Sequence, residues 1–329
     1  MSLRRLDLFR KPFFFSLLLL LLTVLVNFIL QPDLLSPSTL SGNMRVFLPL
    51  ILVAVGQSVV ILGGGIDISV GAIVSIVNAL LATQIGLQGD PGKATLLIIA
   101  SMFVGMAAGA VNGFFVAILR LQPIITTYAT SFLFAGLALF ILPTPGGGMP
   151  SGFTAFYRDA ALLGLPIAFY IIGLILLGWY GLRQRRYGRY LYAVGGKASA
   201  AYETGVPVSA VQFSTYVISG FMAALGGVAI TFLTGSGNAQ VGDSLTLPAI
   251  TAVVIGGTAL SGGTGGIGGA IIGALIIGLL RNIISFAHID TWWQTFVNAA
   301  IIVLALAIPG ILSLIRRSRE LRQTHRRRA

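Results

Sequence analysis

Long apolar stretches separated by short polar connections run through almost the whole chain. A helix needs about 20 mostly apolar residues to cross a bilayer, where it satisfies its own backbone hydrogen bonds. The pattern predicts about ten membrane-spanning helices, near residues 13–30, 47–62, 68–86, 94–119, 123–141, 162–181, 208–233, 247–260, 267–280 and 292–308. We therefore expect an all-α polytopic membrane protein in which some helices are short or interrupted.

The composition supports a single transmembrane domain over residues 1–329. Hydrophobic residues make up 56% of the chain and charged residues 9%, whereas soluble domains carry about 25% charged residues. The polar connections reach about 25 residues, too few for a soluble domain. The first apolar stretch is long for a signal peptide, and residues 31–35 contain no small-x-small cleavage site, so we expect a retained first helix.

The net charge of +12 is spread unevenly over the predicted connections. Of the 21 lysines and arginines, only a few fall on one side of the predicted bundle: Arg45, Lys93, Arg158 and Arg281. The others lie in the N-terminal tail, at Arg120, in the loop at about residues 182–207 and in the tail 316–329. An excess of Lys and Arg marks the cytoplasmic side, which predicts that both termini are cytoplasmic. The basic tail is expected to touch anionic lipid, and nucleic acid is not expected as a partner.

Two glycine-rich segments, residues 59–71 and 253–269, interrupt the apolar pattern and resemble each other. In the predicted topology each lies between an inward-running and an outward-running helix. The likeness is therefore a parallel one, and it does not establish the inverted repeats common in transporters. The stretches beside the second segment have only about 14 residues each, which predicts broken helices or a re-entrant hairpin. Hinges or close packing are expected at Gly63, Gly64, Gly65, Gly256, Gly257, Gly262 and Gly263.

Two further glycine series have a spacing of four residues. They are Gly105, Gly109 and Gly113, and Gly265, Gly269 and Gly273. Each series forms a smooth groove on one helix face, which lets a second helix approach closely. This pattern predicts tight helix packing and carries no information about a substrate.

Residues that would support catalysis are sparse. Gly263, Gly265 and Gly268 match the dinucleotide pattern G-x-G-x-x-G, but that site needs a preceding strand and a soluble βαβ unit. His288 and His325 do not form a metal or nucleophile–base cluster, and a phosphate-binding G-x-x-x-x-G-K-[ST] segment is missing. We expect no enzyme activity and no cofactor in this chain. Any ATP and magnesium would bind to a partner ATPase.

Asp67 is an acidic residue in a strongly apolar region. An intramembrane carboxylate is a candidate for an ion or substrate path. The alternative is a helix cap, since Asp67 follows three glycines and precedes a helix predicted from Ile68, whose free N–H groups attract a carboxylate. No basic residue is near in sequence, which favours the cap.

Amide side chains also fall within the predicted helices: Gln57, Asn78, Asn112 and Asn298. Each could face an aqueous path and bind a hydroxylated solute, or could tie one helix to the next. For any one of them the second role is favoured. Together with Asp67 they are the candidate residues of a substrate path.

The polar loop at about residues 182–207 separates two long apolar stretches. Residues 198–204 are good helix formers, Gly205 can end that helix, and Pro207 prevents its continuation. The short helix could be an interfacial connector whose arginines hold phospholipid. It could equally dock on a cytosolic ATPase and transmit motion to the two adjoining spans.

Three segments carry a resemblance to a known family: residues 64–71, residues 192–206 and residues 248–263. Over about residues 50–306 the chain resembles the membrane permease subunits of ABC importers for monosaccharides, the branch that includes the ribose and galactose systems. Lys197 stands where members of that family often carry asparagine.

The resemblance implies a ten-helix permease in the bacterial inner membrane, paired with a second permease subunit of the same or another kind. Cytosolic ABC ATPase subunits would bind below, and an extracytoplasmic solute-binding protein would deliver a small sugar from outside. The matching ATPase-coupling residues are Lys197, Ala200, Ala201, Glu203, Thr204 and Gly205. The sugar itself is not implied, since related branches carry autoinducer-like furanoses and more distant ones carry nucleosides or branched-chain amino acids.

Other classes of function stay open at the level of sequence. An ion-coupled secondary transporter would use Asp67 as its coupling carboxylate. A non-transporting membrane scaffold would bind a cytosolic partner without moving solute. A membrane-embedded enzyme is the weakest alternative, because no reactive cluster is visible.

Overall fold

The computed structural model describes residues 12–87 and 89–287, together with positions 290, 293, 296, 299, 300 and 303. Over this part the chain is helical, apart from a minimal antiparallel hairpin of β1 (Ala161–Leu162) and β2 (Leu165–Pro166). The helices are α1 (Pro12–Leu30), α2 (Pro37–Leu62), α3 (Val70–Gln84), α4 (Pro91–Gly113) with the π-helix η2 (Phe114–Ile118), α5 (Pro123–Ile141), α6 (Ser151–Asp159), α7 (Ile167–Gln184), α8 (Arg186–Gly196), α9 (Ala198–Glu203), α10 (Val208–Thr234), α11 (Asp243–Ile255) and α12 (Ile267–Phe286).

Among these residues, 6 helices are long and apolar enough to cross a membrane: α2, α4 with η2, α5, α7, α10 and α12. Three shorter apolar helices accompany them, Phe14–Leu30, Val70–Gln84 and Asp243–Ile255. The predicted all-α membrane class is thus confirmed. The total of about ten spans and the side of each terminus stay predictions. The expected stretch 292–308 and the tail 316–329 lie outside the described residues, except for single positions.

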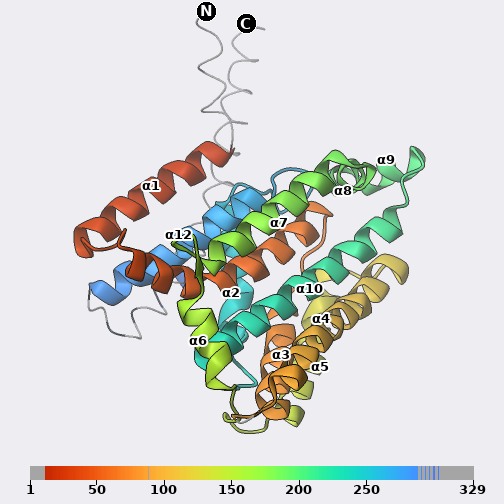
Figure 1. Cartoon of the computed structure of the whole chain (residues 1–329). Coiled ribbons are helices and arrows are strands. Elements are labelled where there is room, and N and C mark those ends of the chain that lie inside the picture. The colour runs from red at the N-terminus through yellow and green to blue at the C-terminus, as the bar shows by residue number, and fades with distance from the viewer. Residues whose placement is uncertain are drawn as a thin grey trace, which may run out of the picture.

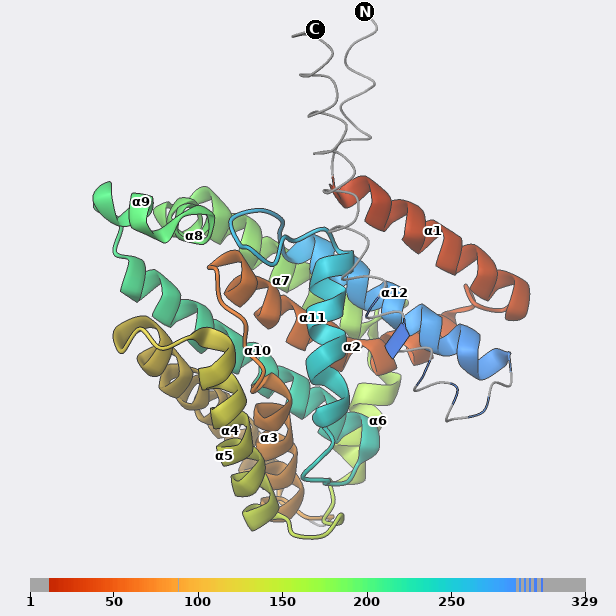
Figure 2. The same cartoon turned by 180° about the vertical axis from the view of Figure 1, so that it is seen from behind.

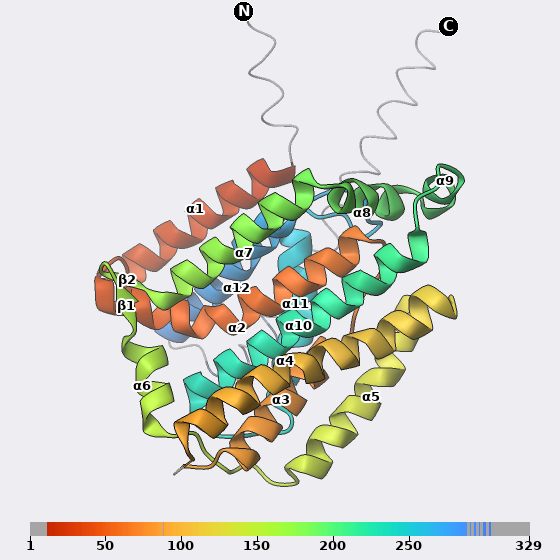
Figure 3. The same cartoon turned by 45° about the vertical axis from the view of Figure 1, so that its right-hand side comes forward.

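Helices α2 and α10 form the centre of the bundle (Figure 1). Helix α10 packs against α2, α3 and α4, while α12 packs against α1, α2 and α11, and α5 covers α3 (Figure 2). The segment α8–α9 lies at one end of the bundle, and α6 with the β1–β2 hairpin lies at the other (Figure 3). In the most apolar 18-residue stretch of each helix, 89% of the residues of α2 are buried, but only 11% of those of α7. Helix α7 is therefore a peripheral element.

Local signals explain where several helices begin. Ser36 precedes Pro37, and its hydroxyl accepts a hydrogen bond from the N–H of Thr39, as an N-cap does. Asp90 precedes Pro91, and its carboxylate accepts from the N–H of Lys93 at 2.8 Å. These caps start α2 and α4 ahead of the apolar runs. Helix α2 accordingly begins ten residues before the predicted span 47–62.

The glycine series on α4 acts as predicted. Gly105 lies so close to α10 that a Cβ there would be 2.6 Å from the Cβ of Ala224, and a Cβ at Gly113 would be 3.0 Å from the carbonyl oxygen of Phe213. Gly109 packs on the backbone of Tyr216. Any larger side chain would separate the helices, so this face of α4 sets its distance from α10.

Two members of the second series join α11 and α12 in the same way. Gly269 packs on the backbone of Gly256, and Gly273 packs on the backbone of Ala252. Gly265, also predicted for this helix face, lies ahead of α12 with a φ of 117° and packs on Thr258, so that part of the prediction was wrong. Helix α12 extends to Phe286 and is long enough to span, so the predicted shortness of the stretch 267–280 was wrong. Helix α11, with 13 residues, is short, as the sequence predicted.

Candidate functional site: two helix breaks and the α8–α9 segment

Helix α2 ends at a glycine break in the Schellman geometry. The N–H of Gly64 donates to the carbonyl of Ile61 at 2.9 Å, and the N–H of Gly65 donates to that of Val60 at 3.0 Å. Gly64 has a φ of 84°, a left-handed conformation that a side chain disfavours. The last carbonyls of α2 are thus satisfied where the helix stops inside the protein.

Helix α11 ends in the same geometry. The N–H of Gly257 donates to the carbonyl of Val254 at 2.9 Å, and the N–H of Thr258 donates to that of Val253 at 3.1 Å. The φ of Gly257 is 83°, within a degree of the value at Gly64. The likeness seen between the two segments in sequence is therefore a likeness of backbone structure.

The carboxylate of Asp67 organises the chain that follows the first break. It is fully buried, and its Oδ1 accepts from the N–H of Ser69 at 3.0 Å and from the Ser69 hydroxyl at 2.7 Å. Its Oδ2 accepts from the hydroxyl of Ser219 on α10 at 3.1 Å. Asn112 of α4 lies at the limit of hydrogen-bond distance, with its Nδ2 3.5 Å from Oδ1. The carboxylate therefore connects the start of α3 to α4 and α10.

Hydroxyl and amide groups extend this network to α5. Asn112 donates to the Ser69 hydroxyl at 2.7 Å and accepts from the Thr130 hydroxyl at 2.6 Å. The N–H of Ile68 donates to the hydroxyl of Thr127 at 3.0 Å. Four helices are thus joined through buried polar groups, each of which has a partner.

Gln57 belongs to the same cluster. In the orientation that gives both its amide nitrogen and its amide oxygen a partner, the Gln57 side chain donates to the carbonyl oxygen of Asp67 at 2.9 Å and accepts from the N–H of Asp67 at 3.3 Å. The hydroxyl of Tyr216 is also buried here, against Gly65, with no hydrogen-bond partner among the described residues. We call Gln57, Asp67, Ser69, Asn112, Thr127, Thr130 and Ser219 the Asp67 network.

The helix-cap hypothesis for Asp67 does not match this geometry in full. Helix α3 begins at Val70. The Asp67 carboxylate accepts a hydrogen bond from the N–H of Ser69, which precedes the helix, so Asp67 closes a turn ahead of α3. Among the described residues the one ion pair joins Arg158 and Asp159, and the Asp67 carboxylate is balanced by neutral donors alone. A role in a substrate path stays a prediction.

Two candidate path residues do not join this cluster. Asn78 ties α3 to the end of α10, donating to the Thr231 hydroxyl at 2.9 Å and to the Ser236 carbonyl at 3.1 Å. It also accepts from the N–H of Asn238 at 2.7 Å. This pattern is that of a helix-to-loop tie. Asn298 lies outside the described residues.

The chain after the second break contacts the end of α8. The N–H of Gly263 donates to the carbonyl of Leu62 at 3.1 Å, and the hydroxyl of Tyr192 donates to the carbonyl of Gly265 at 2.8 Å. A Cβ at Gly195 would lie 2.6 Å from the N of Gly263 and would also overlap the carbonyl of Leu62. A Cβ at Gly262 would lie 3.0 Å from the Cα of Gly64. Backbone thus packs on backbone where α8 meets both breaks.

We call this contact the glycine junction; its members are Gly64, Gly195, Gly262 and Gly263. The sequence predicted close packing or hinges at Gly63, Gly64, Gly65, Gly256, Gly257, Gly262 and Gly263. An added Cβ would lie close to neighbouring atoms at several of them, and a hinge role stays a prediction. The sequence did not indicate that Gly195 would meet them, because α8 is separated from each break by more than fifty residues of chain.

The α8–α9 segment contains two helices where the sequence predicted one. Helix α8 follows α7 almost directly, and the predicted short helix is present as α9. Gly205 follows α9 with a φ of 80°, which confirms its predicted role at the helix end. Of the predicted coupling residues, Ala201 is buried and the following are exposed: Lys197, Ala200, Glu203, Thr204 and Gly205.

Tyr202 is the exposed aromatic residue that the sequence reasoning passed over. It lies on α9 with 72% of its surface exposed. Aromatic side chains are enriched among the residues that dominate binding energy in protein interfaces. An exposed tyrosine on a short helix at one end of the bundle makes this surface suited to a protein partner.

Comparison with known proteins identifies the family. The family described as branched-chain amino acid transport system / permease component matches residues 39–306. This range includes both breaks, the Asp67 network and the α8–α9 segment. The chain belongs to this family of membrane permease components.

Curated relatives match over most of their length. The ribose import permease of Escherichia coli K12 is 33% identical over 300 residues, which cover 89% of this chain and 92% of the relative. The ribose import permease of Bacillus subtilis is 36% identical over 293 residues, 88% of this chain and 90% of the relative. The D-allose transport system permease of Escherichia coli K12 is 34% identical over 268 residues, 80% of each chain. No solved structure matches the chain.

Proposed function

We propose that this chain is the permease subunit of an ATP-driven importer for a small sugar, a monosaccharide of the pentose or hexose class. Relatives named as ribose and D-allose permeases support the sugar. A relative from Photorhabdus temperata, 31% identical over 299 residues, is named as an autoinducer 2 import permease, so a furanose-like solute is the nearest alternative. The chain sits in the inner membrane with both termini cytoplasmic, and a second permease subunit completes the path.

The observation that carries the mechanism is the glycine junction. Helix α8 ends on the backbone of Leu62 at the first break and of Gly262 and Gly263 in the chain after the second break. Helix α9 follows α8 at the end of the bundle (Figure 3). A cytosolic ATPase that pushes on α9 would move the end of α8, and through it the chain that follows the second break. ATP and magnesium would bind to that ATPase, and a solute-binding protein would dock at the α6 end.

Transport measurement tests the function directly. The full chain is reconstituted in liposomes with its candidate ATPase and solute-binding protein, and uptake of labelled ribose and allose is followed. We expect uptake that needs both partners and internal ATP. Uptake that persists without ATP and follows an ion gradient would establish the ion-coupled alternative, above all if Asp67→Asn abolished it.

The docking role of α9 has a separate test. Tyr202→Ala removes the exposed aromatic group, and we expect at least about a tenfold loss of ATPase binding with normal membrane insertion. Tyr180→Ala is the control, because Tyr180 is also exposed, at 65%, but lies on α7. Equal binding by both variants would remove α9 from the ATPase interface.

A further inference from the structure

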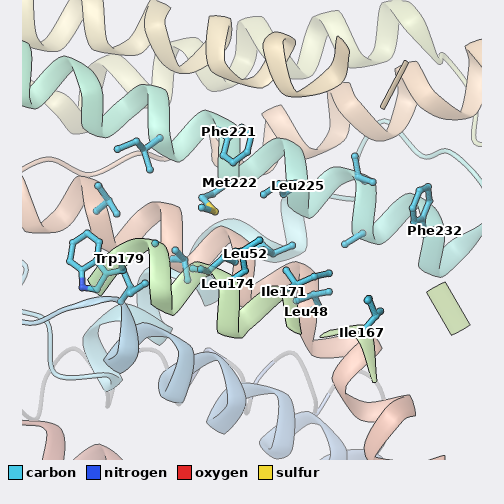
Figure 4. Close-up of a pocket in the computed structure, with 18 of the residues that line it drawn as sticks. Leu48, Leu52, Ile167, Ile171, Leu174, Trp179, Phe221, Met222, Leu225 and Phe232 are labelled. Carbon is cyan, nitrogen blue, oxygen red and sulfur yellow. The ribbon is translucent and has the colours of Figure 1, made fainter. Parts of the chain in front are cut away.

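An apolar groove lies between α7 and the centre of the bundle. It has a volume of about 550 Å³ and is lined mainly by α2, α7 and α10 (Figure 4). Leu48 and Leu52 line it from α2, Leu174 from α7, and Phe221 and Leu225 from α10. Helix α7 is thus separated from its neighbours along much of its length, in keeping with its low burial.

One end of this groove adjoins a cluster of positive charge. Trp179 lines the groove near the end of α7, and Arg183, Arg185 and Arg186 follow within two turns. All three arginines are exposed, and the one ion pair among the described residues is formed elsewhere, between Arg158 and Asp159. Arg183 lies over the ring of Tyr192, with its guanidinium carbon 5.7 Å from the ring centre.

We propose that the groove binds an acyl chain of an anionic phospholipid whose phosphate lies among Arg183, Arg185 and Arg186. The lining is almost purely apolar, which suits a hydrocarbon chain and excludes a sugar. Tryptophan at Trp179 marks the boundary between hydrocarbon and headgroup, where its ring is favoured. The arginines beyond it complement a phosphate in charge and in hydrogen-bond geometry.

Such a lipid would complete the packing of α7 on α2 and α10. Because α7 leads directly into α8, the lipid would also restrict the motion of α8, whose end forms part of the glycine junction. Anionic lipid is then a structural component of the permease, independent of which solute is carried.

Tryptophan quenching tests the proposal on the full-length chain. In a Trp292→Phe/Trp293→Phe background, Trp179 is the remaining tryptophan of the 3 in the chain. The protein is placed in lipid nanodiscs that contain brominated phosphatidylglycerol or brominated phosphatidylcholine. We expect the anionic lipid to quench with an association constant at least about fivefold higher, the preference that one arginine near a membrane surface supplies.

Two pairs of variants locate the site. Gly178 lines the groove, and neither Gly178 nor Gly181 has a neighbouring atom within 4 Å of an added Cβ. Gly178→Phe should therefore fill the groove and remove most of the selective quenching, while Gly181→Phe should not. Arg183→Gln/Arg185→Gln/Arg186→Gln should abolish the headgroup preference. The control Lys93→Gln/Arg120→Gln/Arg281→Gln also removes three positive charges, but away from the groove, and should retain the headgroup preference.

The opposite results overturn the proposal. Equal quenching by the two lipids, or equal effects of Gly178→Phe and Gly181→Phe, would show non-selective contact with bulk lipid. A change in the fraction of dimer with Gly178→Phe, without a change in quenching, would assign the groove to a second copy of the chain. Mass spectrometry of lipid that copurifies with the wild-type protein and with Gly178→Phe gives a readout that does not depend on the tryptophan substitutions.

Discussion

The two helix breaks close in the same way and continue in different ways. Gly64 and Gly257 have matching φ values and matching carbonyl partners. After the first break, Asp67 and its network attach the chain to α4, α5 and α10 through side chains. After the second break half of residues 257–266 are glycine. Two side chains support this chain: the Thr258 hydroxyl accepts from the N–H of Gly266 at 3.3 Å, and the Tyr192 hydroxyl of α8 donates to the carbonyl of Gly265.

This difference indicates a division of roles. Buried hydrogen bonds to a carboxylate are roughly twice as strong as neutral ones, so the first break is anchored. The second break rests on α8 through backbone contacts at Gly195 and Gly263. We therefore expect the second break to move with α8 while the first keeps its place.

Gly195→Ala should have the largest effect, because its Cβ would overlap backbone atoms of Leu62 and Gly263 at once. Backbone atoms cannot relieve the overlap by a change of rotamer. We therefore expect a loss of about 3 kcal/mol in the free energy of unfolding and a loss of ATP-driven uptake. Gly196→Ala is the matched control, with open space at its Cβ. Thermal unfolding in detergent and the uptake assay measure both. Equal behaviour of the two variants would contradict the junction.

Asp67→Ala should cost about 2 kcal/mol, because the Ser69 and Ser219 hydroxyls lose their buried acceptor. Asp67→Asn keeps one carbonyl acceptor and should recover part of the loss. Leu260 occupies the equivalent position after the second break and is 41% exposed, so Leu260→Ala should change stability by less than about 0.5 kcal/mol. Unfolding by SDS measures the three variants, and a large effect at Leu260 would remove the contrast between the breaks.

Gly64→Ala and Gly257→Ala should each cost about 1 kcal/mol, since both residues have a left-handed backbone. The stability losses should match because the local strain is the same. Their effects on uptake should differ, with the larger loss at Gly257, the break that we expect to move. A reversed order in the uptake assay would assign the moving role to the first break.

Tyr192→Phe should lose about 0.5 kcal/mol, less than either glycine variant, since it removes one half-exposed hydrogen bond to the carbonyl of Gly265. Burial raises the pKa of Tyr192, although the nearby Arg183 acts in the opposite direction. The neutral phenol is thus the form that the folded protein favours, and its contribution should be lost only as the pH rises above the ordinary tyrosine pKa. Wild type should therefore lose more stability than Tyr192→Phe in strongly alkaline buffer, as melting curves at two pH values would show.

Much of the site was accessible from sequence because its signals are local. The Schellman endings need glycine at a fixed place, and the glycine series need a spacing of four, so Gly64, Gly257 and Gly105 were all identified. Gly205 was recognised as a helix end for the same reason. The role of Asp67 was not decided by local pattern. Its partners Asn112 and Ser219 stand on other helices, and Ser219 is 152 positions away in sequence.

The sequence by itself determined that this is a membrane helical bundle, where its helices break, and which faces pack closely. Apolar length, caps and glycine spacing act over a few residues and leave little choice to the backbone. Tertiary structure decided which polar groups meet around Asp67, that the end of α8 fits between the two breaks, and that α7 stands apart from the core. Those outcomes depend on how helices distant in sequence pack together. The roles of small residues such as Gly195 and Ser219 are set by the segments of other helices that contact them in the folded protein.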